Sequence, residues 1–507
     1  MQSPSAVRAP PNVSSPRPAV MCRYTLERKS TKNNMAKIIA LLVALAVAAG
    51  VAWSVAGRVP GPKISFIQPT GHIGQTGELH LSVAAPGAKL SRLDVVLEQG
   101  GKQVAIFDLD NFAGASVIQE NGSVQISRAI GKKALPQLEE GRVTIRVLAA
   151  RPLLFGLRQA ESTAGRELDV VLTPPRLSVE SKFHFINRGG SELLVYRVSP
   201  QDVASGVRVG DQEYPGYPAS GAHVSQADPG LHVAFFALLW NQAAATPIEL
   251  YAHDDVGNES RVAFDYRVFP KTFRDSRIVL NDRFLARVVP AILQKSDGLK
   301  VENPSDFLGS FLRINRDLRH ENNETIRALA RASAPKILWD GPFKQLVNTA
   351  VEGGFADQRT YVYQGEVVDH QVHLGFDLAS VSNAAVQAAN HGRVAYAGWL
   401  GIYGNCVIVD HGMGVQSLYA HLSSIAVKAS TQVSLGQILG YTGSTGLAGG
   451  DHLHFTMLLG GNPVTPVDWW SGKWVQDRIV RKLHEASQEP PDAMESKTST
   501  GHKSRAT

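Results

Sequence analysis

The chain has 507 residues, of which 44% are hydrophobic and 19% charged, so it is a globular protein too long for a single core. Its formal net charge is +6, but residues 1–37 hold seven basic residues and one acidic residue, which account for all of that charge. The remainder is neutral overall. This balance gives no electrostatic reason to expect nucleic acid as a partner.

An apolar segment without charged residues extends from residue 38 to residue 57. At about 1.5 Å per residue, a helix of this length spans the roughly 30 Å of a bilayer core, which predicts a transmembrane or signal anchor. Because basic residues precede it, we expect residues 1–37 in the cytoplasm and the body outside the inner membrane, in the periplasm or extracytoplasmic space. A cleavable signal peptide, cut after Ser54-Val55-Ala56, is the alternative that the length of the segment disfavours.

Met35-Ala36-Lys37 resembles an ordinary start of such an apolar segment. We therefore expect residues 1–34 to have no folded role.

Two regions of short apolar runs follow the anchor. In residues 62–173, apolar residues recur at every second position, as at Leu79, Leu81 and Val83 and again at Val143, Ile145 and Val147. This pattern predicts an immunoglobulin-like β domain. Pro174-Pro175 marks a boundary. Residues 176–268 are expected to form a second β region, either another sandwich or an extension of the first, and both regions are interpreted as spacers or wall-binding modules.

The period of the apolar residues changes in residues 271–335 to that of helices, and Asn303-Pro304 predicts the start of one of them. From residue 339 to residue 470 strands and glycine turns return. Residues 475–507 are expected to form a polar tail whose end has too little apolar content to fold. The sequence thus predicts a mainly β multidomain protein with an N-terminal transmembrane helix and a short helical segment.

Three short segments in residues 339–470 carry residues suited to chemistry: HLGFD at 373–377, YAHLS at 419–423 and DHLHF at 451–455. The last lies in an apolar run that reads as a strand, so His452 and His454 project from one face. His373 and Asp377 bring a further imidazole and a carboxylate, with Gly375 between them expected to let the backbone bend. Two histidines and one carboxylate are a common catalytic zinc set, which leaves a fourth position for water.

The order and flanking residues of these segments resemble the lysostaphin/LytM type of zinc endopeptidase. Residues 373–377 are similar to that family's H-x-G-x-D, and residues 452–455 to its H-L-H-F. The glycine-punctuated stretches 392–398, 407–412 and 436–446 follow the same pattern. The resemblance covers about residues 339–470, a quarter of the chain. One departure is Gly449-Gly450-Asp451, where the family usually has a small residue, glycine and proline.

The resemblance implies an antiparallel β-sheet peptidase domain that holds one zinc ion per chain through His373, Asp377 and His454. It implies that His421 and His452 are catalytic residues that do not bind the metal. The implied function is hydrolysis of peptide bonds in peptidoglycan stem peptides or cross-links, which makes peptidoglycan the partner. The alternative is a catalytically silent envelope protein that binds the wall or activates other wall hydrolases.

Residues outside this set receive weaker interpretations. His370, His391 and His411 are expected to be structural, and Arg359 is a candidate for the wall of the substrate groove. The retention of all five site positions favours a working enzyme over an activator.

Overall fold

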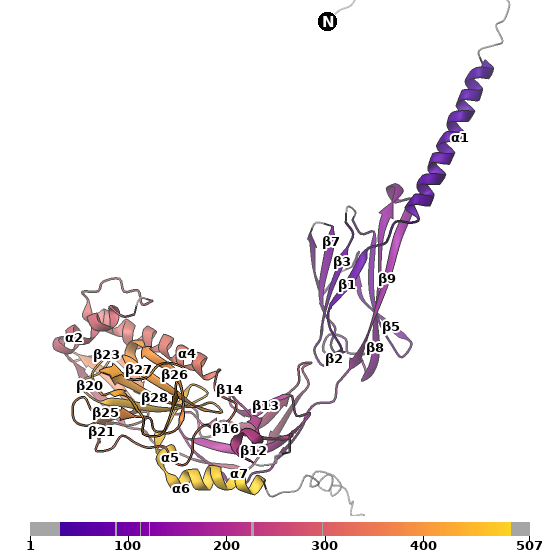
Figure 1. Cartoon of the computed structure of the whole chain (residues 1–507). Coiled ribbons are helices and arrows are strands. Elements are labelled where there is room, and N and C mark those ends of the chain that lie inside the picture. The colour runs from indigo at the N-terminus through magenta and orange to yellow at the C-terminus, as the bar shows by residue number, and fades with distance from the viewer. Residues whose placement is uncertain are drawn as a thin grey trace, which may run out of the picture. The chain divides into compact units, whose positions relative to one another are not determined.

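The computed structural model describes residues 31–487 except 87–88, 112, 121, 225–227 and 297. The prediction of a mainly β protein with an N-terminal apolar helix is confirmed (Figure 1). The chain divides into two compact units, each described here by itself. Of the described residues, the first comprises residues 31–71, 78–129 and 142–168, and the second comprises residues 72–77, 130–141 and 169–487.

Helix α1 (Thr31–Ala56) contains the predicted apolar segment. Its part from Asn34 to Ala56 is long and apolar enough to cross a membrane, a property that a signal sequence shares. The basic segment predicted for residues 1–37 lies largely outside the described residues.

Strands of the first unit alternate between buried and exposed side chains, as the sequence predicts. One sheet has the order β1 (Lys63–Gln68), β3 (Glu78–Ala84), β7 (Ser123–Ala129) and β6 (Ala115–Glu120). The other contains β9 (Arg158–Val170), β8 (Gly141–Leu153), β4 (Arg92–Gln99) and β5 (Lys102–Asp108). β2 (His72–Ile73) belongs to the second unit and pairs there with Asp169 and Val170, the last residues of β9. Leu79, Leu81 and Val83 are buried on β3. The immunoglobulin-like topology stays a prediction.

The second unit begins with the predicted second β region, which forms three small sheets. The first contains β10 (Arg176–Val179), β12 (Ser191–Ser199), β16 (Leu231–Ala237) and β15 (Tyr217–Pro218). The second contains β14 (Gln212–Pro215), β13 (Ala204–Val209), β17 (Ile248–His253) and β18 (Glu259–Ala263), and the third pairs β11 (His184–Asn187) with β19 (Tyr266–Phe269). Every residue of β16 is buried, so this strand is covered on both faces.

The helical segment begins with a strand that the sequence pattern does not reveal. β20 (Asp275–Leu280) pairs in parallel with β22 (Asp357–Tyr363), which pairs with β23 (Glu366–His373). Helix α2 (Asp282–Leu293) follows, and then α3 (Phe307–Arg313), a π-helical turn (Ile314–Leu318) and α4 (Arg319–Ala330) form one continuous helix.

The predicted helix start at Asn303 is wrong by three residues. Asp306 is the N-cap, because its side chain accepts a hydrogen bond from the Gly309 amide at 2.9 Å. Asn303 instead stabilises the preceding turn, where its side chain accepts from the Ser305 amide at 3.1 Å.

The C-terminal sheet has the order β21 (Ala350–Gly353), β24 (Phe376–Ala379), β32 (Leu453–Leu459), β28 (Val415–Leu422), β27 (Asn405–Gly412), β26 (Gly392–Trp399) and β30 (Gln432–Val433). β33 (Asn462–Val464) pairs with β32, and a smaller sheet contains β25 (Ala385–Gln387), β31 (Ile438–Tyr441) and β29 (Ser424–Ile425). All neighbouring strands of this sheet are antiparallel. Its five central strands, β24, β32, β28, β27 and β26, contain no exposed residue.

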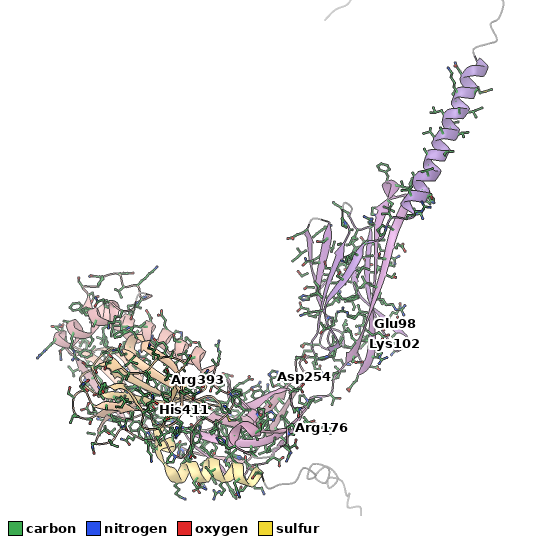
Figure 2. The ribbon with its side chains drawn as sticks, in the orientation of Figure 1. Glu98, Lys102, Arg176, Asp254, Arg393 and His411 are labelled. Carbon is green, nitrogen blue, oxygen red and sulfur yellow. The ribbon has the colours of Figure 1, made fainter. Side chains whose placement is uncertain are left out.

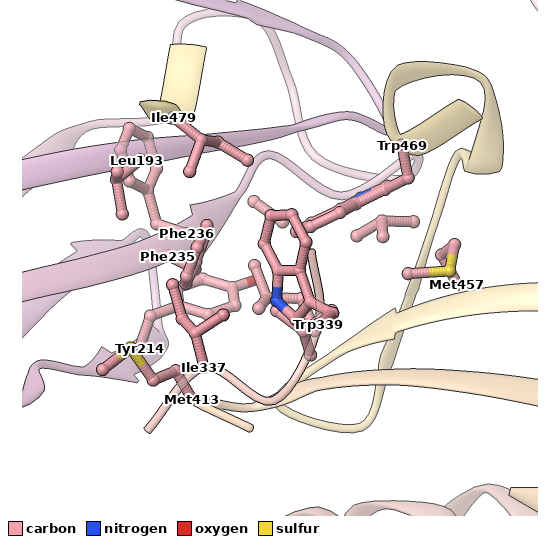
Figure 3. Packing of buried hydrophobic residues seen from close by; sticks show 14 of the residues in the cluster. Leu193, Tyr214, Phe235, Phe236, Ile337, Trp339, Met413, Met457, Trp469 and Ile479 are labelled. Atoms are coloured by element: carbon pink, nitrogen blue, oxygen red, sulfur yellow. The ribbon is translucent and has the colours of Figure 1, made fainter. Parts of the chain in front are cut away.

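The C-terminal sheet and the second β region share one hydrophobic core. Figure 3 shows Phe235 and Phe236 of β16 near Trp339 and Trp469, which flank the C-terminal sheet in the sequence. The rings of Phe235 and Trp469 lie 5.8 Å apart, and those of Trp339 and Trp469 also lie 5.8 Å apart. The two regions therefore stabilise each other through buried aromatic area.

A helix follows the sheet where the sequence predicts the start of a polar tail. Helices α5 (Pro466–Trp470), α6 (Gly472–Val475), a π-helical turn (Gln476–Val480) and α7 (Arg481–Ala486) occupy this stretch, while residues 488–507 lie outside the described residues. Lys482 of α7 is buried and donates to Glu192 Oε1 and to the Leu193 carbonyl, both at 2.9 Å. The sequence does not indicate this helix, because a buried ion pair between Lys482 and Glu192 contributes to its packing and a lysine is normally read as a surface residue.

Replacement of Lys482 by methionine is expected to lower the free energy of unfolding by about 3–5 kcal/mol, because the fully buried Glu192 carboxylate loses its closest cation. Urea unfolding of the body measures the loss. Lys473→Met is the control on the same helix, since the Lys473 side chain is 86% exposed and its ion pair with Asp477 contributes little. Equal losses in the two variants would contradict the role of the buried pair.

Candidate active site

The register of the C-terminal sheet brings two of the predicted site residues face to face. Asp377 on β24 lies directly opposite His454 on β32, and His454 lies opposite Ala420 on β28. Directly opposite residues of antiparallel strands project to the same face. The side chains of Asp377 and His454 therefore meet. His421 is the residue after Ala420 on β28, so it lies next to the residue that is opposite His454.

Three side-chain atoms converge at this point. His373 Nε2 lies 2.9 Å from Asp377 Oδ1 and 3.0 Å from His454 Nδ1, and His454 Nδ1 lies 3.0 Å from Asp377 Oδ1. His373 and His454 are buried, and the Asp377 side chain is 13% exposed. The fold thus brings together His373 and His454, which are 81 positions apart in the sequence.

The second nitrogen of each ring is already engaged. His373 Nδ1 donates to the Gly354 carbonyl at 2.9 Å. His454 Nε2 donates to Thr456 Oγ1 at 3.0 Å, and the Thr456 hydroxyl donates onward to the Leu374 carbonyl at 3.0 Å. Because these bonds place the protons on the outer nitrogens, the nitrogens that face the cluster carry lone pairs.

Asp377 is oriented in the same way by an arginine. Arg359 on β22 donates from Nη2 to Asp377 Oδ2 at 3.0 Å, which leaves Oδ1 for the cluster. Arg359 Nε donates to Asp357 Oδ2 at 3.2 Å, and Ser276 of β20 donates to Asp357 Oδ1 at 2.7 Å. A chain of polar contacts thus runs from β20 through β22 to the carboxylate.

Two further histidines adjoin the cluster. The ring of His421 lies 4.9 Å from that of His452 and 5.7 Å from that of His454. Nδ1 of His421 donates to the Thr445 carbonyl at 2.8 Å, and Nδ1 of His452 donates to the Gly450 carbonyl at 2.9 Å. These bonds leave Nε2 of His421 available for a ligand or substrate, whereas Nε2 of His452 lies 3.4 Å from Asp377 Oδ1.

The backbone of His421 is in the left-handed region, with φ of 62°. This conformation is uncommon for a residue other than glycine and costs on the order of 1 kcal/mol, and such residues gather at functional sites.

The environment shifts the pKa values of these groups in different directions. Burial lowers the pKa of His454 to about 4, although Asp377 opposes the shift. Burial, followed by the neighbouring His452 and His454, holds the pKa of His421 well below its usual value. Burial would raise the pKa of Asp377, but the adjacent imidazoles of His373, His452 and His454 outweigh this and keep the pKa well below its ordinary value.

The three converging atoms fit a metal ion. Two imidazole lone pairs and a carboxylate oxygen repel one another at about 3 Å unless a cation lies between them. Ligand atoms around a tetrahedral metal with bonds of about 2.0 Å lie about 3.3 Å apart, close to the distances found here. His373, Asp377 and His454 could therefore share one ion.

Glycines make room for this cluster. A Cβ atom on Gly375 would lie 2.5 Å from His454 Nε2 and 2.4 Å from Thr456 Oγ1, so close approach and not a left-handed backbone requires this glycine. A Cβ atom on Gly353 of β21 would lie 2.6 Å from Asp377 Oδ2 and 2.8 Å from Arg359 Nη2.

The loop before β32, which departs from the expected motif, is fixed at two places. Arg287 of α2 donates to the carbonyls of Ala448 and Gly449 at 2.9 and 2.8 Å. Asp451 Oδ2 accepts from the Ser382 hydroxyl and the Asn383 amide, both at 3.1 Å. Asp451 thus ties the loop to a neighbouring turn, a role that proline would not perform.

Comparison with known proteins identifies this part of the chain. The model of peptidase family M23 matches residues 371–466. Residues 371–466 form an M23 peptidase domain. This domain contains all five predicted site residues, and the resemblance to lysostaphin/LytM-type enzymes is confirmed.

Relatives of the M23 domain carry different descriptions. The chain is 40% identical over 97 residues to the DD-carboxypeptidase/endopeptidase Mpg of Neisseria meningitidis, which covers 19% of this chain and 22% of that protein. It is 37% identical over 95 residues to the murein hydrolase activator EnvC of Escherichia coli, which covers 19% and 23%. The chain thus spans less than a quarter of the length of these relatives.

A crystal structure of an M23 peptidase from Pseudomonas aeruginosa aligns with 56% of this chain and 94% of its own, at 20% identity and a TM-score of 0.35.

Arg359 lies outside the M23 domain and also contributes to the site. Arg359 contacts Asp377 itself, whereas the sequence suggested only a place in the groove wall.

His411, labelled in Figure 2, is buried at the end of β27, and its two nitrogens contact the His391 carbonyl at 2.6 Å and Ser417 Oγ at 2.7 Å. These contacts agree with its structural interpretation.

Substitution of Gly353 by alanine is expected to lower the free energy of unfolding by about 1–3 kcal/mol, because the new methyl group displaces Asp377 and Arg359. Chemical denaturation measures the change. Gly354→Ala is the matched control, since a Cβ atom there meets nothing within 4 Å, and its effect should stay within about 0.5 kcal/mol. Indistinguishable stabilities of the two variants would show that the site tolerates the added atom.

Proposed function

We propose that the chain is a zinc-dependent endopeptidase that hydrolyses peptide bonds in the stem peptides or cross-links of peptidoglycan. The observation that carries the proposal is the convergence of three ligand atoms from side chains that are each oriented by a second contact, beside two histidines whose Nδ1 atoms donate to backbone carbonyls. The M23 match and the relatives described as peptidoglycan DD-endopeptidases support the substrate class.

In this proposal His373, Asp377 and His454 hold one zinc ion per chain. A zinc ion supplies a Lewis acid that polarises the scissile carbonyl and makes water more acidic. Arg359 keeps Asp377 turned so that one carboxylate oxygen faces the ion. Burial of the two ligand histidines strengthens these interactions because water competes little in the site.

His421 and His452 handle the protons. Each ring has its Nδ1 proton committed to a backbone carbonyl, so Nε2 of the neutral His421 ring is a proton acceptor. Nε2 of His452 lies 3.4 Å from Asp377 Oδ1, and although burial would lower the pKa of His452, Asp377 raises it, which suits this ring to carry a proton. One ring takes the proton of the attacking water, and the pair returns it to the leaving amine. When protonated, either ring also stabilises the negative charge that develops on the carbonyl oxygen.

The location of the substrate fits the rest of the chain. Helix α1 anchors the protein in the inner membrane in this proposal, with residues 1–37 in the cytoplasm. The body then lies in the periplasm, next to peptidoglycan. The β regions act as spacers or as wall-binding modules.

A second candidate function is activation of other wall hydrolases without catalysis. The relative described as the murein hydrolase activator EnvC favours this possibility. Retention of both the ligand set and His421 and His452 favours the enzyme. The two functions differ in whether zinc and the five side chains are needed.

Removal of a ligand is expected to separate these functions. His454→Ala and Asp377→Ala should lose the bound zinc and wall hydrolysis, whereas His421→Ala should keep one zinc per chain and lose activity by at least about 100-fold. Metal analysis of the purified chain and mass spectrometry of digested peptidoglycan measure both properties. Undiminished cellular effects in the ligand variants would favour the activator, and full activity in His421→Ala would remove the role given to that residue.

Loss of Arg359 is expected to weaken zinc binding about 10- to 100-fold, because Asp377 is then free to rotate away from the ion. Competition with a chromogenic chelator gives the dissociation constant of zinc in Arg359→Ala. Arg359→Lys should retain part of the affinity, since it keeps the charge but not the fork of donors. Arg277→Ala, at an exposed position of β20, is the control. Unchanged affinity in Arg359→Ala would show that Asp377 needs no partner.

A further inference from the structure

A cavity of about 570 Å³ lies beside the proposed metal ligands and takes no part in the chemistry described above. Its lining includes Arg359, which contacts Asp377, and Leu374, which follows His373. Arg319, at the start of α4, and His370 of β23 also line it. The size suits a peptide side chain or a chain end, and the lining residues Arg359 and Leu374 place such a group beside the proposed metal ligands.

Arg319 is the positively charged residue of this cavity for which the described residues provide no ion pair, although Asp275 lines the same cavity. Arg359 also lines the cavity, but it is paired with Asp357 and Asp377. Among the described residues, Arg319 forms no ion pair. It donates from Nε to the Asn315 carbonyl at 3.1 Å and from Nη2 to Asn315 Oδ1 at 2.6 Å. Since a guanidinium has five N–H donors, three remain for a ligand.

The position of Arg319 is fixed by a buried network. Asn315 is fully buried, and its amide donates to Asp369 Oδ2 at 2.8 Å. Arg316 donates from Nε to the other carboxylate oxygen of Asp369 at 2.9 Å. Asp369 therefore holds Asn315, and Asn315 holds Arg319. A preformed guanidinium loses little side-chain entropy when it binds an anion.

The helix is also deformed at this point. Residues Ile314–Leu318 form a π-helical turn between α3 and α4, with Arg319 immediately after it. The wider turn shifts the direction of the side chains that follow relative to a continuous α-helix, and such turns are frequent at functional sites. The helical segment lies outside the matched M23 domain.

We propose that Arg319 forms a substrate-binding subsite for a carboxylate group of the peptide whose bond is cut. This inference rests on the proposed endopeptidase function and specifies its substrate as an anionic peptide. Bidentate binding by a guanidinium is the usual way in which proteins recognise a carboxylate. Asp275 also lines the cavity, so a substrate with an ammonium group beside its carboxylate is compatible with the same subsite.

A binding experiment with matched peptides tests the subsite without turnover. The zinc-loaded full chain carrying His421→Ala, in detergent, is titrated with a cross-linked stem-peptide dimer with free carboxylates and with its amidated counterpart. We expect the free form to bind about tenfold more tightly, and Arg319→Gln to abolish this preference by weakening the free form alone. Arg319→Lys should retain part of the preference.

Arg313→Gln is the matched control, because Arg313 lies on the same helix but pairs with Asp317 at the surface. The preference for free carboxylates should be unchanged in it. The proposal is overturned if both peptides bind the parent protein equally, if neither binds, or if Arg319→Gln weakens both peptides by the same factor.

Hydrolysis by the chain with an intact His421 is measured in parallel by the appearance of new amines. Absence of hydrolysis together with an Arg319-dependent preference would remove the endopeptidase function and leave the subsite. Hydrolysis without that preference would remove the subsite and leave the endopeptidase.

Discussion

Mutual repulsion among three electron-rich atoms is the constraint around which the C-terminal half of this protein is built. His373 Nε2, His454 Nδ1 and Asp377 Oδ1 lie within 3.0 Å of one another in a largely buried place. Such an arrangement is unfavourable unless a cation is bound. The fold imposes it nonetheless, through the register of β24 with β32 and through second contacts that prevent each side chain from turning away.

The parts that impose this arrangement extend beyond the M23 domain. Arg359 of β22 and Gly353 of β21 both contact Asp377, and neither lies in the matched residues. Arg287 of α2 fixes the loop that precedes His452. The M23 domain supplies the reactive side chains, while the segments before it restrict where those side chains can point.

The sequence predicted the site residues because their motifs are local. HLGFD and DHLHF each place their polar groups within five positions, so strand geometry alone relates His452 to His454. Arg359 escaped a firm assignment because its contact with Asp377 depends on how two separate sheets meet, which no short pattern encodes. Gly375 was expected to permit a bend, whereas the structure requires it for space beside His454.

The helices and strands also were predictable where a local pattern determines them, and not where a remote contact does. Alternation predicted β3 and β8, where one face is buried. The pattern failed for β20, which lies in a stretch read as helical, and for the C-terminal helix, whose buried Lys482 looks like a surface residue in the sequence. In both cases a partner remote in the chain decides the structure.

The hydrophobic core that joins β12 and β16 to the C-terminal sheet has a consequence for how this protein can change over time. Phe235 and Trp469 pack against each other, so neither region can be exchanged or deleted without uncovering the aromatic surface of the other. Recombination that transfers the M23 domain alone would expose this aromatic surface to water, so we expect selection against it. The second β region and the peptidase sheet are therefore expected to be inherited together.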